Sequence, residues 1–129
     1  RLFEPGYWED YDLSWRAAKR GWFSVYTPDA LAIHHGGGSM TKRFGEQRVR
    51  AMKARNHLLF EMANLRSPRM IAEWLARIPM GSMRSDEFRG ALAEALKFLP
   101  AVLRARKKVV GQFSDEMLLE PFKNFTPSF

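Results

Sequence analysis

Apolar and polar residues alternate with a helical period along most of this chain. Between residues 44 and 65, apolar side chains recur every three or four positions, and basic residues fill the positions between them. This spacing predicts a helix that buries one face and exposes a basic face. The apolar positions of this helix are Met52, Leu58, Leu59, Met62 and Leu65.

Residues that favour helix ends delimit the segments that follow. Ser67 before Pro68 is typical of an N-cap with proline at the first helical position, and Pro79 is expected to end that helix. Ser85 is expected to cap the next helix, which Pro100 ends. The remaining segments are predicted to be a linker and two shorter helical stretches, at residues 80–84, 102–110 and 115–120.

The first third of the chain has a different pattern. Residues 12–20 predict a short helix, and Gly21 is expected to end it. Residues 22–26 are rich in aromatic and β-branched side chains, which predicts a strand closed by a turn at residues 27–29. Residues 30–33 form a second short apolar run.

These elements predict an α/β fold in residues 1–43, followed by a mostly α-helical extension over residues 44–129. The charged residues are also distributed unevenly along the chain. Residues 40–110 hold sixteen Lys and Arg against six Asp and Glu, a net charge of +10, whereas residues 1–39 have a net charge of −1. A strongly basic middle region favours contact with an anionic partner.

Composition narrows the class of protein. A chain of 129 residues with 46% hydrophobic residues can form one hydrophobic core. The absence of cysteine excludes disulfide bonds and thiolate metal sites. No segment approaches the roughly 18 uninterrupted apolar residues of a membrane-spanning helix, so we expect no segment to cross a bilayer by itself.

Acids, histidines and glycines gather in two short motifs. Glu9 and Asp10 follow Trp8, and His34-His35 begins 24 residues after Asp10, just before three glycines. Carboxylates and imidazoles together are the groups of a metal-assisted or general-base site. The residues alone also fit a simpler interpretation, in which the acids stabilise the first turn of a helix and one histidine is structural.

The order of these motifs resembles the C-terminal half of the catalytic domain of family-2 glycosyltransferases. The similarity covers about residues 3 to 60, and its last motif is similar to a helix of bacterial members that build cell-surface polysaccharide. The residues that show it are Tyr7 to Arg16, Gly21-Trp22, Val25-Tyr26, Pro28-Asp29-Ala30, His34 to Ser39 and Arg55 to Phe60.

The resemblance implies an inverting enzyme with a GT-A type α/β fold that binds a nucleotide-diphosphate sugar. It implies that Asp10 is the general base and that His34, or alternatively His35, is a ligand of Mn²⁺ or Mg²⁺. The other ligands would come from an Asp-x-Asp motif in the N-terminal half of the domain, which this chain does not contain. The chain would therefore be a C-terminal fragment, inactive by itself.

Chemistry supports those residue types. A sugar hydroxyl attacks an anomeric carbon poorly while it keeps its proton, so a carboxylate must lie within about 2.6–3.2 Å to accept it. Glu9 would orient the acceptor, which would be a saccharide or a lipid-linked molecule. The other predicted substrate contacts are Trp8, Asp12, Gly36, Gly37 and Arg43.

Two alternatives of other classes stay open. A metal-dependent hydrolase would use Asp10, Asp12, His34 and His35 as ligands. A non-enzymatic basic helical adaptor would not need the first third of the chain at all. For the enzyme we expect a cytoplasmic location. Its basic amphipathic helices suit the anionic inner face of the membrane, and they equally suit packing on the catalytic domain with an ordinary charged surface. No nucleic acid is expected as a partner, since no recognition motif accompanies the charge.

Overall fold

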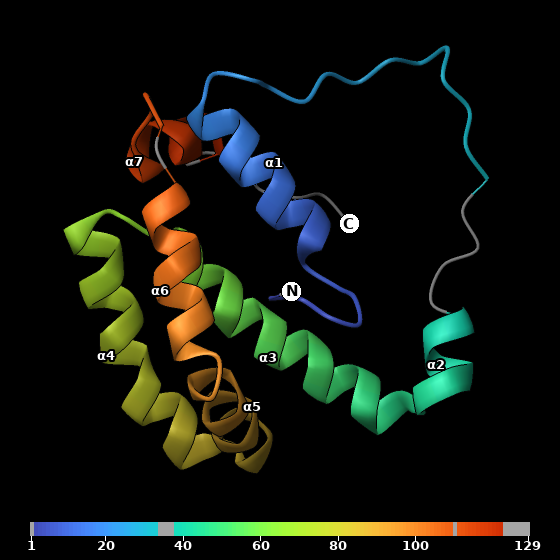
Figure 1. Ribbon diagram of the computed structural model, residues 1–129, viewed down its shortest axis with the longest axis vertical. Helices are drawn as coiled ribbons and strands as arrows, with labels where there is room; N and C mark the ends of the chain where they lie inside the picture. The colour runs from blue at the N-terminus through green and yellow to red at the C-terminus, as the bar shows by residue number, and fades with distance from the viewer. Residues whose placement is uncertain (1, 34–37, 110, 123–129) are drawn as a thin grey trace.

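The computed structural model describes residues 2–33, 38–109 and 111–122. These residues form seven α-helices and a short 3₁₀ helix, with α3 running through the middle of the molecule (Figure 1). The helices are α1 (Glu9–Lys19), α2 (Gly38–Phe44), α3 (Glu46–Asn64), α4 (Pro68–Arg84), α5 (Asp86–Leu96), α6 (Leu99–Lys108), α7 (Asp115–Leu119) and η1 (Glu120–Phe122).

The predicted α/β fold of GT-A type in the first third is wrong, because the described residues form no strand. Residues 22–33 instead form a long irregular connection that leaves the helical body (Figure 1), and Val25 and Leu31 are 86% and 93% exposed. The predicted turn is present, with the Ala30 N–H donating to the Thr27 carbonyl at 3.4 Å. Strand-forming residues become a strand only where a neighbouring strand bonds their backbone, and the described residues supply none.

Helix α1 begins earlier in the chain than predicted. Trp8 precedes it with a φ of 74°, and the Trp8 carbonyl accepts a hydrogen bond from the Asp12 N–H at 2.9 Å. The helix ends before Gly21, as predicted, and the φ of +83° at this position is one that glycine adopts without strain. Glu9 and Asp10 therefore lie in the first turn of α1.

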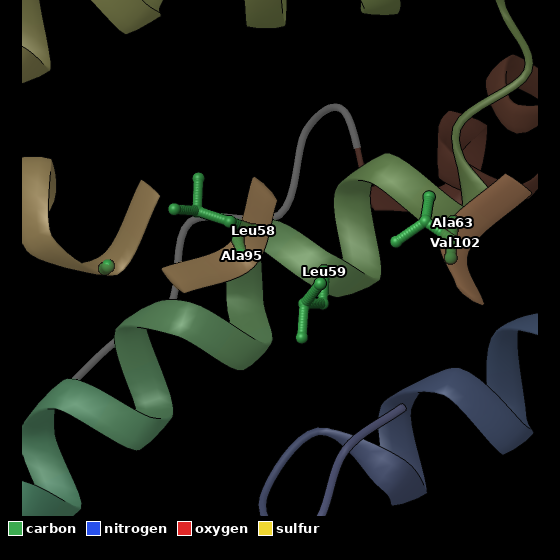
Figure 2. Close-up of a cluster of buried hydrophobic side chains, with 6 residues drawn as sticks. Leu58, Leu59, Ala63, Ala95 and Val102 are labelled. Carbon is green, nitrogen blue, oxygen red and sulfur yellow. The ribbon is translucent and has the colours of Figure 1, made fainter. Parts of the chain in front are cut away.

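The hydrophobic core lies where α5 and α6 pack on α3 (Figure 2). Leu59 of α3 is fully buried, and Ala91 and Ala95 of α5 belong to the same cluster, where their small side chains allow the two helices to approach closely. Val102 of α6 completes this contact. The full cluster of buried residues is Leu58, Leu59, Ala63, Ala91, Ala95 and Val102.

Helix α4 begins as predicted but does not end where predicted. Ser67 caps it, with Oγ accepting a hydrogen bond from the Met70 N–H at 3.3 Å. Pro79 lies inside the helix, and the linker predicted after it is helical. Proline removes only one N–H from the helix, and the turn beyond it is packed: a Cβ on Gly81 would stand 3.0 Å from the Phe88 ring of α5.

The remaining helices follow their predicted order. Ser85 caps α5, its Oγ accepting a hydrogen bond from the Phe88 N–H at 3.1 Å. Helix α6 starts at Leu99 rather than at Val102, because Pro100 opens the helix in its first turn instead of only ending the previous one. Among the described residues, no helix is both long enough and apolar enough to span a membrane.

Candidate functional site

The predicted base lies directly after a turn with unusual backbone geometry. Tyr7 and Trp8 both have a φ of 74°, a left-handed conformation that residues other than glycine rarely adopt. The Trp8 ring stacks on the His57 ring of α3, with centroids 4.3 Å apart and planes inclined by 10°. The Tyr11 ring also lies near the Trp8 ring, with centroids 4.9 Å apart, and the contact of Trp8 with a sugar stays a prediction.

The side chain of Asn56 holds this turn against α3. Its amide nitrogen donates to three backbone carbonyls, those of Phe3 at 3.2 Å, Gly6 at 2.8 Å and Tyr7 at 3.0 Å. Asn56 is fully buried. Three carbonyls share two N–H groups here, so this one side chain attaches the segment that leads into α1 at three points.

Arg55 adds a second attachment of the same segment. Its Nη2 donates to the Glu4 carbonyl at 2.6 Å, and its Nε donates to Oδ1 of Asn56 at 2.9 Å, which orients the amide. Together with His57, which stacks on Trp8, three consecutive residues of α3 contact the segment before α1. The sequence pattern did not indicate these contacts, because the partners are about 50 residues apart.

Glu9 and Asp10 are both exposed. Oδ1 of Asp10 accepts a hydrogen bond from the Tyr11 N–H at 2.9 Å, and the carboxylate remains accessible to solutes. The first turn of a helix favours acidic side chains because the helix dipole is positive there. This position is therefore compatible with a general base, which must reach its substrate, and also with a residue that only stabilises the helix.

Asp12 has a different environment from Asp10. Its Oδ2 accepts a hydrogen bond from Nε of Arg16 at 2.8 Å, and its Oδ1 accepts one from Nδ2 of Asn64 at 2.7 Å. These contacts engage both carboxylate oxygens and connect α1 with the end of α3. The contact of Asp12 with a substrate stays a prediction.

The predicted metal ligands His34 and His35, with Gly36 and Gly37, lie outside the described residues. Within the part of the chain that the structure describes, no three His, Asp or Glu side chains lie close enough to hold a metal ion. The chain returns to the turn before α1 soon after the histidine motif, since Cε of Met40 lies 3.6 Å from the position of a Cβ on Gly6.

Arg43, a predicted diphosphate contact, is exposed on α2. Its guanidinium carbon lies 5.3 Å from the centre of the Phe44 ring, and that of Arg48 lies 5.4 Å from the same ring. Both contacts are within the range of cation–π attraction. The pair presents two positive charges at the junction of α2 and α3, and the binding of a diphosphate by Arg43 stays a prediction.

A cleft of about 790 Å³ lies between α1 and α6. Its basic lining residues are Arg16 of α1 and Arg104, Lys107 and Lys108 of α6. Lys107 and Lys108 lie three and four positions after Arg104, which places these basic side chains on one side of the helix. No other feature of the sequence indicates this cleft. Asp10 does not line the cleft, so the predicted base and this basic surface are separate features of α1.

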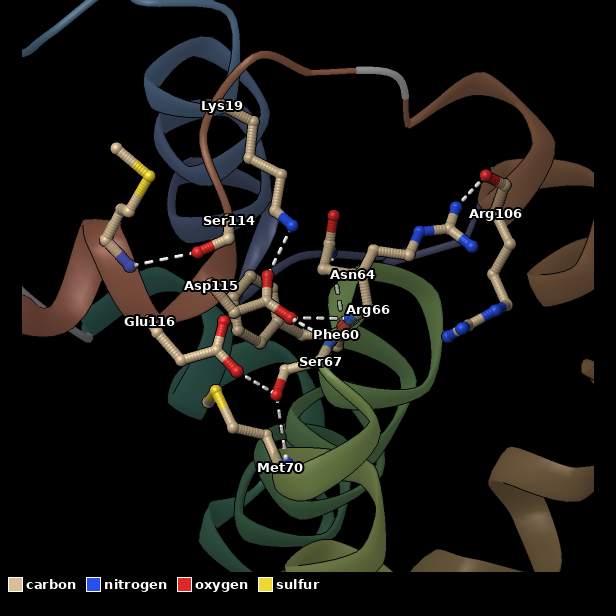
Figure 3. Close-up of polar contacts among 11 residues, drawn as sticks. Lys19, Phe60, Asn64, Arg66, Ser67, Met70, Arg106, Ser114, Asp115 and Glu116 are labelled. Carbon is tan, nitrogen blue, oxygen red and sulfur yellow. Dashed lines mark hydrogen bonds and ion pairs between the residues drawn. The ribbon is translucent and has the colours of Figure 1, made fainter.

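A second group of polar contacts joins the ends of several helices (Figure 3). Arg66 donates to the Arg106 carbonyl, and Nη1 of Arg106 donates to the Met62 carbonyl at 2.6 Å. Burial lowers the pKa of Arg106, and the nearby Arg66 charge lowers it further. The Ser67 hydroxyl donates to the Glu116 carboxylate. The hydrogen bonds of Arg66 and Arg106 thus join the end of α3 to α6, and the hydrogen bond of Ser67 joins the start of α4 to α7.

No protein-family model, no curated protein and no solved structure matches this chain. The resemblance to family-2 glycosyltransferases therefore depends on the sequence motifs alone. The anchored turn and the exposed Asp10 are observations that do not depend on it.

Proposed function

We propose that this chain is the C-terminal part of an inverting glycosyltransferase in which Asp10 takes the proton of the acceptor hydroxyl. The observation that supports this most directly is the position of Asp10. Its exposed carboxylate lies on the first turn of α1, and the turn before it is attached to α3 by Asn56 and Arg55. A base must be both accessible and held in a defined position, and Asp10 meets both conditions.

In the proposed reaction, the acceptor oxygen forms a bond to the anomeric carbon of the donor sugar. The bond from that carbon to the diphosphate breaks, and its electron pair leaves with the nucleoside diphosphate. The proton of the acceptor hydroxyl passes to the Asp10 carboxylate. Attack from the face opposite the leaving group inverts the anomeric carbon. Glu9, exposed beside Asp10, would accept a hydrogen bond from a second acceptor hydroxyl and so orient it.

The donor in this proposal is a nucleotide-diphosphate sugar, and the acceptor is a saccharide or a lipid-linked molecule. Mn²⁺ or Mg²⁺, when bound, would offset the negative charge that develops on the leaving diphosphate. The residue that this chain would contribute to the metal is His34, or alternatively His35. Most of the donor site would belong to the N-terminal half of the catalytic domain, which is the required partner of this chain.

The test uses the complete enzyme with its N-terminal half. Asp10→Asn should reduce transfer by a factor of about 10²–10⁴, because an amide cannot accept the acceptor proton. Donor affinity, measured by calorimetry, should be unchanged. Glu87→Gln, which changes an exposed acid in the first turn of α5, is the matched control and should retain the transfer activity, measured as nucleoside diphosphate release. Full activity of Asp10→Asn would contradict the proposal.

The isolated 129-residue chain provides a second test. It should show no turnover of sugar nucleotides, because it lacks most of the donor site, and measurable turnover would contradict this assignment. Calorimetry of the same chain with Mn²⁺ distinguishes the main alternative. Tight metal binding by the isolated chain would favour a metal-dependent hydrolase over a glycosyltransferase fragment.

A further inference from the structure

Helix α4 is rich in apolar residues, yet none of its residues is buried. One of its faces packs inward, where Trp74 contacts the core and donates from its indole N–H to Glu61 at 2.7 Å. A second apolar row faces outward at the spacing of one helix face, and each of its members is exposed. This outer row consists of Ala72, Leu75, Ala76, Pro79 and Met83.

The outer row is continuous with an apolar groove between α4 and α6, two helices that lie next to each other in Figure 1. The groove has a volume of about 390 Å³. Leu75 belongs to the outer row and also lines the groove, where Leu96, Leu99 and Leu103 are exposed as well. The outer row and the groove together form one apolar surface, here named the α4–α6 face.

Positive charge surrounds the α4–α6 face. Residues 66–108 contain ten Lys and Arg against four Asp and Glu, a net charge of +6. Helix α4 contributes Arg69, Arg77 and Arg84 with a single acid, Glu73, which pairs with Arg69 at 2.9 Å. Arg106 of α6 lines the groove itself. The face therefore combines exposed apolar side chains with an excess of basic ones.

We propose that the α4–α6 face binds the surface of an anionic lipid bilayer, with α4 lying in the plane of the interface. Helices with an apolar face and Lys or Arg beside it insert that face about 5–10 Å into the headgroup region. Anionic headgroups then attract the basic residues around it. Leu75 and Met83, which are 52% and 85% exposed, would enter the bilayer.

The positive charge around the α4–α6 face favours a bilayer over a second copy of this chain as its partner. Two copies that met through the α4–α6 face would bring two positively charged surfaces together, and like charges repel. An anionic bilayer offers the opposite charge and an apolar interior at once. The exposed apolar residues of the α4–α6 face belong to α4, α5 and α6, whereas Asp10 lies on α1. Loss of vesicle binding would therefore not affect the proposed role of Asp10, and loss of that role would not affect vesicle binding.

Because the chain has no cysteine, single fluorescent labels can report the orientation directly. Met83→Cys labels the outer row, and Leu13→Cys, on the 62% exposed side chain of α1, is the matched control. The full chain with an environment-sensitive label is mixed with phosphatidylglycerol-containing vesicles at low salt. The emission at position 83 should shift to the blue and that at position 13 should not. Pure phosphatidylcholine vesicles should cause no shift.

Substitutions test the contributions of apolar and charged residues separately. Replacing Leu75 and Met83 together by Asp should lower the vesicle partition coefficient at least tenfold, whereas Leu13→Asp should leave it unchanged. Arg84→Gln, at an exposed position beside Met83, should lower it about fivefold, since each basic residue near an anionic surface contributes about 1 kcal/mol. High salt should release the wild-type chain because it screens these charges. Circular dichroism confirms that each variant keeps its helices.

Four results would overturn the proposal. The first is the absence of sedimentation with anionic vesicles at low salt, and the second is equal binding to neutral vesicles. The third is an equal shift of the labels at positions 83 and 13. The fourth is a stable dimer in solution in which the label at position 83 is shielded without lipid, which would assign the face to a second copy of the chain.

Discussion

The ammonium group of Lys19 forms a buried ion pair with the carboxylate of Asp115. Lys19 ends α1 and Asp115 begins α7, so the pair joins two helices that are far apart in the sequence (Figure 3). Oδ2 of Asp115 also accepts hydrogen bonds from the N–H groups of Arg66 at 2.5 Å and Ser67 at 2.7 Å. The carboxylate thus holds together the end of α1, the start of α4 and the start of α7.

Removing the lysine charge should be costly, because the carboxylate would stay buried without its counterion. Lys19→Met is expected to lower the free energy of unfolding by about 3–5 kcal/mol, measured by urea denaturation. Lys42→Met, on the exposed side of α2, is the control and should change it by less than about 0.5 kcal/mol.

A double variant checks that the ion pair itself is responsible. Asp115→Asn keeps an oxygen that can accept the N–H groups of Arg66 and Ser67 but removes the charge. Combined with Lys19→Met, it should cost less than the sum of the two single changes, because no unpaired charge is left. Strict additivity would contradict the assignment of the cost to the pair.

The free energy of unfolding should depend on pH through the carboxylate of Asp115. Burial alone would raise the pKa of Asp115, but the Lys19 contact and the N–H groups of Ser67 and Arg66 hold that pKa below its usual value. The unfolded chain therefore takes up the proton first as the pH falls. The stabilisation is complete above the ordinary aspartate pKa of about 3.9 and is lost as the pH falls through the lower folded pKa.

Urea denaturation at a series of pH values from about 5 to 3 measures this effect. The free energy of unfolding of the wild-type chain should fall with pH more steeply than that of Asp115→Asn. Glu116, whose pKa is also lowered, is present in both chains, so the difference between the two slopes reports Asp115 together with the effect of its charge on Glu116. Parallel slopes would contradict the prediction.

The attachment of the turn before α1 should depend on the amide of Asn56. Asn56→Asp replaces the donor with a carboxylate that faces the carbonyls of Phe3, Gly6 and Tyr7, so the turn should separate from α3. Hydrogen exchange of the peptide that contains residues 2–8 should become faster. Gln47→Ala, at an exposed position of the same helix, should not change it.

Two glycines should respond in opposite ways to alanine. A Cβ on Gly111 would stand 2.5 Å from the Lys19 carbonyl oxygen, so Gly111→Ala must displace the backbone and lower the melting temperature. Gly90 lies inside α5 with no atom within 4 Å of its Cβ position, and Gly90→Ala should raise stability by about 0.5–1 kcal/mol. Thermal unfolding of both variants measures this contrast.

Local features of the helices were predictable from the sequence because their causes are local. The Ser67 and Ser85 caps each act on an N–H group three residues away, and Gly21 ends α1 through its own backbone freedom. The end of α4 was not predictable. Pro79 lies within the helix because the following turn packs on Phe88, which belongs to another helix.

The candidate site was predictable only in part. The position of Glu9 and Asp10 near the start of a helix follows from acids that precede a helical pattern. The attachment of that turn to Asn56 was missed, since its partners lie about 50 residues away and no local pattern connects them. The two histidines lie outside the described residues, so their role stays a prediction.

By itself, then, the sequence determined where helices begin, which of their faces are apolar and where charge accumulates, because each of these depends on neighbours within a few residues. Tertiary structure decided whether residues 22–33 form a strand, which acid pairs with Lys19 and which turn Asn56 holds. Strand pairing and buried polar contacts need partners from distant parts of the chain, and only packing brings those partners together.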